Sequence, residues 1–240
     1  MRGVGLTMPA GFRMESHVHD WPQLIFAVRG VITVSADGGN WVVPPMRGLW
    51  VPAGIRHSLH MAGTVAMRTL YLDPALPLGF ADSCCVIEVV PLLRELIVSI
   101  VSVGGLRDDG PTDRARLTLL LELLSGRPAQ PLALPMPKDQ RARSVAERVL
   151  ADLRSTLTLD EWSRGSGASG RTIDRLFRTD TGMAFGRWRQ QARLLEAIRL
   201  LGLSVAVTEV ALRVGYRSPS AFVAAFRRSM GKTPAAYIRG

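Results

Sequence analysis

Cysteine and long apolar runs are scarce in this sequence of 240 residues. The only two cysteines, Cys84 and Cys85, are adjacent, and adjacent cysteines rarely form a disulfide, so nothing indicates an oxidising compartment. They either bind a soft metal or pack near a strand as small apolar side chains, and the second alternative is favoured. No apolar run reaches the roughly 18 to 20 residues that span a bilayer, and residues 1–11 lack the apolar segment of a signal peptide. We therefore expect a cytoplasmic protein that does not enter a membrane.

Excess positive charge is missing from the first part of the chain. Residues 1–137 contain 11 Arg and no Lys against 11 acidic residues, whereas residues 138–240 contain 17 Arg and two Lys against nine acidic residues. The whole net charge of +10 therefore lies in the last part. This asymmetry predicts a neutral module joined to a module that binds a polyanion. An arginine-rich surface that serves only solubility is the alternative, but it does not account for the neutral first part.

A proline-rich stretch separates the two parts. Residues 127–137, RPAQPLALPMP, hold four prolines, which continue neither a helix nor a central strand, and we interpret them as a semi-rigid linker. A chain of this length, 47% hydrophobic, is sufficient for two modest domains with buried cores. The predicted division is a first domain over 1–126, the linker, and a second domain over 138–240.

Short β-strands and two helices are predicted in the first domain. The strand segments are rich in β-branched and aromatic residues and alternate with turn sequences such as ADGGN, a pattern typical of a small β-barrel or sandwich. They cover residues 24–28, 31–35, 41–43, 48–51 and 67–72. The helices are predicted at 91–103 and 112–126, and both are more apolar than a surface helix. They need a partner, either the barrel or a second subunit, and we expect them to form a homodimer.

The last part of the chain is helical throughout and contains one layout twice. Helices are predicted at 139–154, 159–165, 170–179, 184–201, 207–213 and 219–229. In the segments 159–178 and 207–228 a short helix runs into a glycine turn, and then Ser169 or Ser218 caps the next helix. This is helix-turn-helix spacing, and the long helix between the copies can hold them roughly 34 Å apart, one turn of DNA.

The second helix of the first copy has an apolar back and a basic front. Ile173, Leu176 and Phe177 share one face, while Arg171 and Arg175 point elsewhere. Arginine bonds guanine through two parallel hydrogen bonds, and flanking Arg and Lys hold phosphates, so the pattern fits the major groove of double-stranded DNA. The alternative is a plain helical bundle with a basic surface.

Residues 140–240 resemble the AraC/XylS family of bacterial transcription regulators, above all in AVTEVALRVGYRSPSAFVAAFRRSMGKTPAAYIR, residues 206–239. The resemblance implies a double helix-turn-helix domain that binds specific DNA sequences. The residues implied to contact DNA are Arg171, Thr172, Asp174, Arg175 and Arg178 in the first copy, and Arg217, Ser218, Pro219, Ser220, Ala224 and Arg227 in the second. The first copy departs from the usual pattern at Ser163, Ser166 and Ala168, where small or apolar residues such as alanine and valine are common.

Three of the four histidines lie in two motifs of the first domain. The order His17-x-His19-x3-Gln23-x6-Gly30, followed by Pro-x-Gly-x2-His57, resembles the two motifs of the cupin family. The resemblance implies a cupin-like β-barrel in which His17, His19 and His57, with Gln23 as a neutral fourth ligand, hold a divalent transition metal. A pocket of the same residues without a metal is the other alternative. His60 follows His57 by an odd offset, so on a strand it faces away from the others.

A small organic effector is expected in the same domain. Trp21, Phe26, Trp50 and Met61 are the candidates for an apolar pocket lining. The sequence therefore predicts an α+β protein of two domains: a cupin-like effector and dimerisation domain with two trailing helices, and an all-α DNA-binding domain. The function expected is transcription regulation without enzymatic activity. A metal-dependent cupin enzyme, a dioxygenase or isomerase, is the rival, but it leaves the basic second domain without a purpose.

Overall fold

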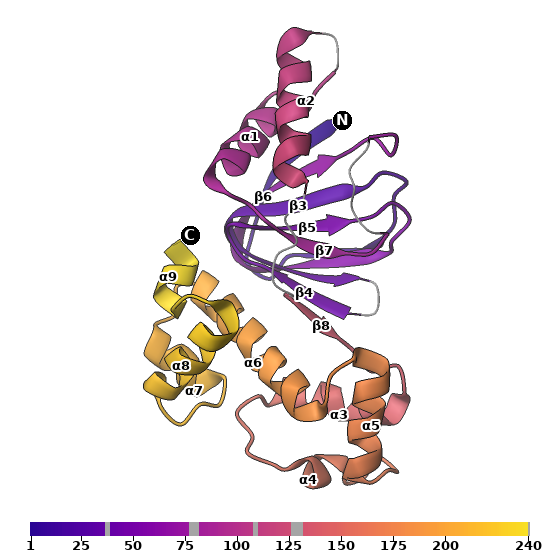
Figure 1. The fold of residues 1–240 in the computed structure, drawn as a ribbon, viewed down its shortest axis with the longest axis vertical. Helices are drawn as coiled ribbons and strands as arrows, with labels where there is room; N and C mark the ends of the chain where they lie inside the picture. Colours follow the sequence, from indigo (N-terminus) through magenta and orange to yellow (C-terminus); the bar gives the residue numbers. More distant parts are fainter. Residues whose placement is uncertain (37–38, 77–81, 108–109, 126–131, 240) are drawn as a thin grey trace. The chain divides into compact units, whose positions relative to one another are not determined.

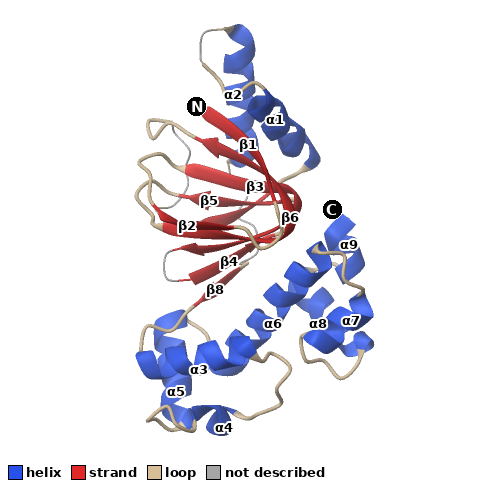
Figure 2. Ribbon diagram, turned by 180° about the vertical axis from the view of Figure 1, so that it is seen from behind, coloured by secondary structure: helices blue, strands red, loops and turns tan. Residues whose placement is uncertain are grey.

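The computed structural model describes residues 1–36, 39–76, 82–107, 110–125 and 132–239. The chain divides into two compact units: residues 1–37 with 41–132, and residues 38–40 with 133–240. The first unit is rich in strands and the second consists mainly of helices (Figure 1, Figure 2). The predicted fold class, a sheet-rich N-terminal domain followed by a helical C-terminal domain, is confirmed. Within the described residues, no helix has the length and hydrophobicity needed to cross a membrane.

The described strands form one sheet of eight. They are β1 (Arg2–Met8), β2 (Arg13–His17), β3 (Gln23–Ala36), β4 (Gly39–Val43), β5 (Arg47–Val51), β6 (His57–Tyr71), β7 (Cys85–Glu88) and β8 (Ala133–Pro135). The main path of paired strands runs β1-β6-β3-β4-β8, while β2 pairs with β6, β5 with β3, and β7 with β5. Among the described strands this path has two ends, β1 and β8, so the predicted cupin-like domain contains an open sheet over the described residues.

The sheet turns on a bent ribbon made by the two longest strands, β3 and β6. Register shifts flank Arg29, and Gly30 has a φ of 81°. A Cβ at Gly30 would lie 2.6 Å from the Thr64 carbonyl oxygen, so only glycine fits there. The two halves of the ribbon then meet different neighbours, since the end of β6 pairs with β1 and its beginning pairs with β2. Sequence patterns predicted two separate strands, 24–28 and 31–35, because the glycine resembles a turn.

Several elements escaped prediction from the sequence. The strands β1, β2 and β7 were not predicted, and β8 lies inside the stretch interpreted as a linker, of which residues 127–131 are outside the described residues. The Cys84 side chain is buried beside β7, and burial raises the pKa of the Cys85 thiol. Both positions agree with the interpretation of these cysteines as small packing residues.

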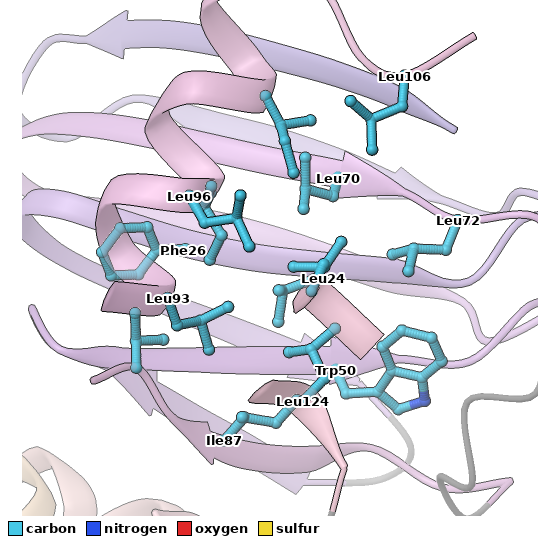
Figure 3. Packing of buried hydrophobic residues seen from close by; sticks show 14 residues of the cluster. Leu24, Phe26, Trp50, Leu70, Leu72, Ile87, Leu93, Leu96, Leu106 and Leu124 are labelled. Carbon is cyan, nitrogen blue, oxygen red and sulfur yellow. The ribbon is translucent and has the colours of Figure 1, made fainter. Parts of the chain in front are cut away.

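The helices α1 (Pro91–Ser102) and α2 (Pro111–Leu124) cover one face of the sheet. Their buried leucines include Leu93 and Leu120, each 0% exposed, and they join side chains from β3, β5, β6 and β7 in one hydrophobic cluster (Figure 3). Glycines in β1 let α1 approach closely, since a Cβ on Gly3 would lie 3.0 Å from the Val101 Cα. Of the two partners considered for these apolar helices, the sheet is therefore the one that buries their inner face.

The second unit consists of seven described helices after β8. They are α3 (Gln140–Ala151), α4 (Leu159–Ser163), α5 (Gly170–Thr181), α6 (Phe185–Gly202), α7 (Val207–Arg213), α8 (Pro219–Met230) and α9 (Pro234–Arg239). Local capping explains the starts of α5 and α8, where Ser169 and Ser218 accept hydrogen bonds from backbone N–H groups. Left-handed Gly182 and Gly231 end the same two helices. The helix α9 was not predicted.

Candidate functional site

His17, His19 and His57 lie together in the first unit. His17 ends β2 and pairs across the strands with His57, the first residue of β6, and their ring centroids are 4.3 Å apart. One nitrogen from each of the three rings lies within 4.8 Å of the others. Strand pairing explains why His17 and His57 meet. His19 lies beyond the end of β2, in the segment that leads into β3, so strand geometry does not place it.

Gln23 lies beside two of the three rings, those of His19 and His57, at the start of β3, and it is 2% exposed. Its Oε1 is 3.0 Å from His19 Nε2 and 3.1 Å from His57 Nε2. Its Nε2 donates to the Thr69 hydroxyl at 2.8 Å, and that hydroxyl donates in turn to the Leu24 carbonyl at 3.0 Å. Because the single Thr69 proton is already used, Thr69 can only accept from Gln23. This chain fixes the amide so that its oxygen faces the imidazoles.

Backbone carbonyls orient two of the three imidazoles. His17 Nδ1 lies 2.8 Å from the Glu15 carbonyl, and His57 Nδ1 lies 2.9 Å from the Ile55 carbonyl. Each Nδ1 therefore carries the proton, and each Nε2 is left to the cluster. Burial lowers the pKa of His57, the bond to Ile55 raises it, and the neighbouring His17 and His19 lower it, with a lowered pKa as the net result.

The donor set suits a divalent transition metal. A neutral His57 that donates from Nδ1 has only a lone pair on Nε2, and this lone pair faces the lone pairs of Gln23 Oε1. A cation between the two atoms would turn this repulsion into coordination. His19 Nδ1 is buried without a hydrogen-bond partner, a cost that a bound ligand relieves. Three imidazoles anchored by carbonyl acceptors are a ligand set that suits zinc, copper, iron and nickel.

His60, Met61 and Trp21 lie at different places relative to the histidine cluster. His60 is not part of the histidine cluster, as its odd offset in β6 predicted. Met61 is buried, and its even offset in β6 places it on the same face as His57. Trp21 is 40% exposed and lines a cavity that His19 also lines.

The assignment of Phe26 and Trp50 to the effector pocket is corrected. Both are buried in the hydrophobic cluster beneath α1 and α2 (Figure 3). Phe26 follows Gln23 by three residues, so it points to the opposite face of β3. Trp50 pairs with Leu24 and shares that opposite face. Sequence reasoning missed three residues, Arg2, Thr69 and Tyr71. Only the strand register brings them to the face of the sheet that carries Gln23.

The front of α5 presents exposed arginines, and Asp174 has a different position from the one expected. Arg171, Arg175 and Arg178 are exposed, while Ile173 and Phe177 are buried on the other side. Asp174 accepts from the Phe185 N–H at 2.9 Å and from Arg178 Nε at 2.8 Å. Partial burial raises the pKa of Asp174. The two hydrogen bonds together outweigh this effect, so the pKa is lowered below its ordinary value. Asp174 therefore caps α6, and its carboxylate is not free to read a base.

The front of α8 is small and nearly uncharged. Ser220, Ala224 and Arg227 are exposed, and Phe222 and Phe226 are buried behind them. The Ser218 hydroxyl accepts from the Ala221 N–H at 3.2 Å, so it caps the helix that begins at Pro219. Arg217 is exposed in the turn before α8. Specific contacts from α8 would therefore be mostly apolar, such as contact with thymine methyl groups.

In α5, Thr172 lies beside the serine that caps that helix, Ser169, with the two hydroxyl oxygens 3.1 Å apart.

Comparison with known families matches both units. Residues 6–134, more than half of the chain, match the family described as "AraC-like ligand binding domain", and residues 162–240 match "Helix-turn-helix domain". The chain belongs to the AraC family. This AraC-family chain is a transcriptional regulator with a DNA-binding helix-turn-helix domain and a ligand-binding domain.

Relatives of this AraC-family regulator cover one or both units. The HTH-type transcriptional regulator NimR of Escherichia coli (strain K12) is 31% identical over 222 residues, which are 92% of this chain and 81% of NimR. The regulator RipA of Corynebacterium glutamicum is 34% identical over 106 residues, which are 44% of this chain and 32% of RipA. Among solved structures, the DNA-binding domain of AdpA in complex with a target DNA is 39% identical. It covers 41% of this chain and 90% of its own, with a TM-score of 0.39.

Proposed function

We propose that a divalent transition metal and a small effector in the first unit control how this regulator binds specific DNA sequences. The observation that carries the proposal is that one nitrogen from each of the three imidazoles lies within 4.8 Å of the others, with the Gln23 amide oxygen beside two of them, His19 and His57. When bound, a metal would supply a Lewis-acidic centre for an effector atom. The chain's own residues orient the imidazoles and close the site beneath with Gln23. The proposal gives the site a regulatory role, not a catalytic one, and places the protein in the cytoplasm with the DNA that it binds.

The first prediction concerns the metal. Replacing His57 with alanine is expected to lower Zn²⁺ affinity by about 10- to 100-fold or more, because one of three strong ligands is lost. Replacing Gln23 with glutamate should change affinity in the opposite direction, because a carboxylate adds the negative charge that the amide lacks. Isothermal titration of the purified full chain with Zn²⁺ measures both changes.

His60→Ala is the matched control for this titration, since His60 lies on the same strand as His57 but is not part of the cluster. It should bind Zn²⁺ as the unmodified chain does. Equal Zn²⁺ affinity in His57→Ala and the unmodified chain would contradict the metal site. The DNA affinity of each variant, measured with and without Zn²⁺, tests whether the site is coupled to DNA binding.

We also propose that the regulator forms a homodimer through α1 and α2. Leu93 and Leu120 cannot make this contact, because the sheet already buries them, and a charge there would disrupt the core. The outer apolar residues are Leu92 at 55% exposure, Leu119 at 39% and Val103 at 57%. Exposed leucines on neighbouring helices support an interface with a second copy.

The second prediction follows from these exposed leucines. The double variant Leu92→Glu, Leu119→Glu should remain folded and sediment as a monomer at micromolar concentration, whereas the unmodified chain sediments as a dimer. Charges at an apolar interface lose burial and gain a desolvation cost, while the same charges in water cost little. The control is Glu95→Gln, an exposed change on the same α1 helix that should leave the dimer intact. A monomeric unmodified chain at this concentration would rule out the interface.

A further inference from the structure

A cavity of about 470 Å³ opens beside the histidine cluster in the first unit. Its described lining residues are Arg2, Val4, His19, Trp21 and Tyr71. Its volume lies within the range of roughly 300 to 1,000 Å³ that is usual for small-molecule sites. The cavity shares His19 with the proposed metal site, so a molecule bound in it would lie next to the imidazoles.

Strand register builds the wall of this cavity. Arg2 of β1 and Gln23 of β3 both pair with Tyr71 of β6, one on each side. Side chains directly opposite one another on paired strands point to the same face. Arg2, Tyr71 and Gln23 therefore form one row across three strands, with the Gln23 end beneath the histidines. The Arg2 guanidinium marks the other end of the row.

The lining residues combine one positive charge with aromatic surfaces. Arg2 carries the only permanent charge among the described lining residues. The Tyr71 ring meets the His19 ring edge to face, with centroids 5.3 Å apart. Trp21 also lines the cavity and is 40% exposed overall, so a bound ring could cover part of its apolar surface.

We infer that this cavity binds a small aromatic carboxylate, with its carboxylate on Arg2 and its ring between Trp21 and Tyr71. Guanidinium groups bind carboxylates through two parallel hydrogen bonds, and indole and phenol rings pack against flat apolar groups. A cation or a neutral amide of the same shape cannot form the paired charged bonds with Arg2. The inference rests on the proposed function, because it names the chemical class of the effector of that same unit.

Three probes of matched shape and different charge test this inference. Phenylacetate is the anion, phenylacetamide the neutral analogue and 2-phenylethylamine the cation, each titrated calorimetrically into the full chain. Phenylacetate should bind at least about tenfold more tightly than the other two, as expected for a charge-assisted pair. Arg2→Gln should remove this preference, and Trp21→Ala should weaken all probes that bind. Arg29→Gln, which removes an exposed arginine elsewhere in the same unit, should leave the preference unchanged.

Zn²⁺ titration of the same variants separates this inference from the proposed function and checks that the fold is intact. Arg2→Gln should bind Zn²⁺ as the unmodified chain does, because Arg2 is not in the histidine cluster. Equal affinity for the three probes, or an anion preference that survives in Arg2→Gln with Zn²⁺ binding intact, overturns the inference and leaves the metal site standing. An anion preference that Arg2→Gln alone abolishes supports it.

Discussion

Replacing Trp188 with alanine is expected to lower the free energy of unfolding of the C-terminal unit by about 3 to 5 kcal/mol and to abolish specific DNA binding. Trp188 is 0% exposed on α6, and its ring lies 5.1 Å from that of Phe177, the buried anchor of α5. Its indole N–H donates to the Pro135 carbonyl at 2.7 Å. The alanine variant would leave a cavity behind the first helix-turn-helix copy and a carbonyl without its partner.

Two matched variants make this measurement specific. Trp188→Phe keeps most of the packing but loses the indole hydrogen bond and some ring volume, so it should cost about 1 to 3 kcal/mol, less than the alanine variant. Arg187→Ala removes an exposed neighbour on the same helix and should change stability by less than about 0.5 kcal/mol. Urea unfolding followed by circular dichroism at 222 nm, a helical signal, measures all three. An alanine variant as stable as the unmodified chain would show that α5 does not depend on α6.

Replacing Arg171 or Arg175 with alanine should each weaken binding to the regulator's own site by about 1 to 3 kcal/mol. Both arginines are exposed on the front of α5, while the back of that helix is buried. A site is first selected from genomic fragments, and affinity is then measured by fluorescence anisotropy at several salt concentrations. The loss should be larger at the selected site than at an unrelated duplex, because base contacts specify and phosphate contacts do not.

Charge alone must be separated from base reading in this experiment. Arg175→Lys keeps the charge and loses the paired hydrogen bonds, so it should retain binding to unrelated DNA and lose discrimination. Arg29→Ala removes an exposed arginine from the other unit and should leave DNA affinity unchanged. If both single alanine variants bind the selected site with the affinity of the unmodified chain, α5 is not the recognition helix.

Local features of this protein could be predicted from its sequence. Ser169 and Ser218 mark the starts of α5 and α8 because a serine cap acts within three residues. The positions of Phe177 and Phe222 on the buried faces follow from the period of 3.6 residues. The three clustered histidines were also predicted, from the resemblance to the cupin motifs, although His19 lies beyond the strand that ends at His17. Such local patterns can be predicted from the sequence because they depend on residues that are close together in the chain.

Which surface covers which face was decided only by the tertiary structure. Phe26 and Trp50 are as apolar as any pocket lining, but the strand register places them beneath α1. The alignment of Arg2 with Tyr71, and the use of Asp174 as a cap for α6, both join residues from different elements. Composition and periodicity carry no information about such pairings, because a side chain's partner depends on how distant segments pack. The sequence by itself determined the two modules and the anchors of the DNA-binding helices, and the tertiary pairing of strands decided which residues surround the cavity beside the histidines.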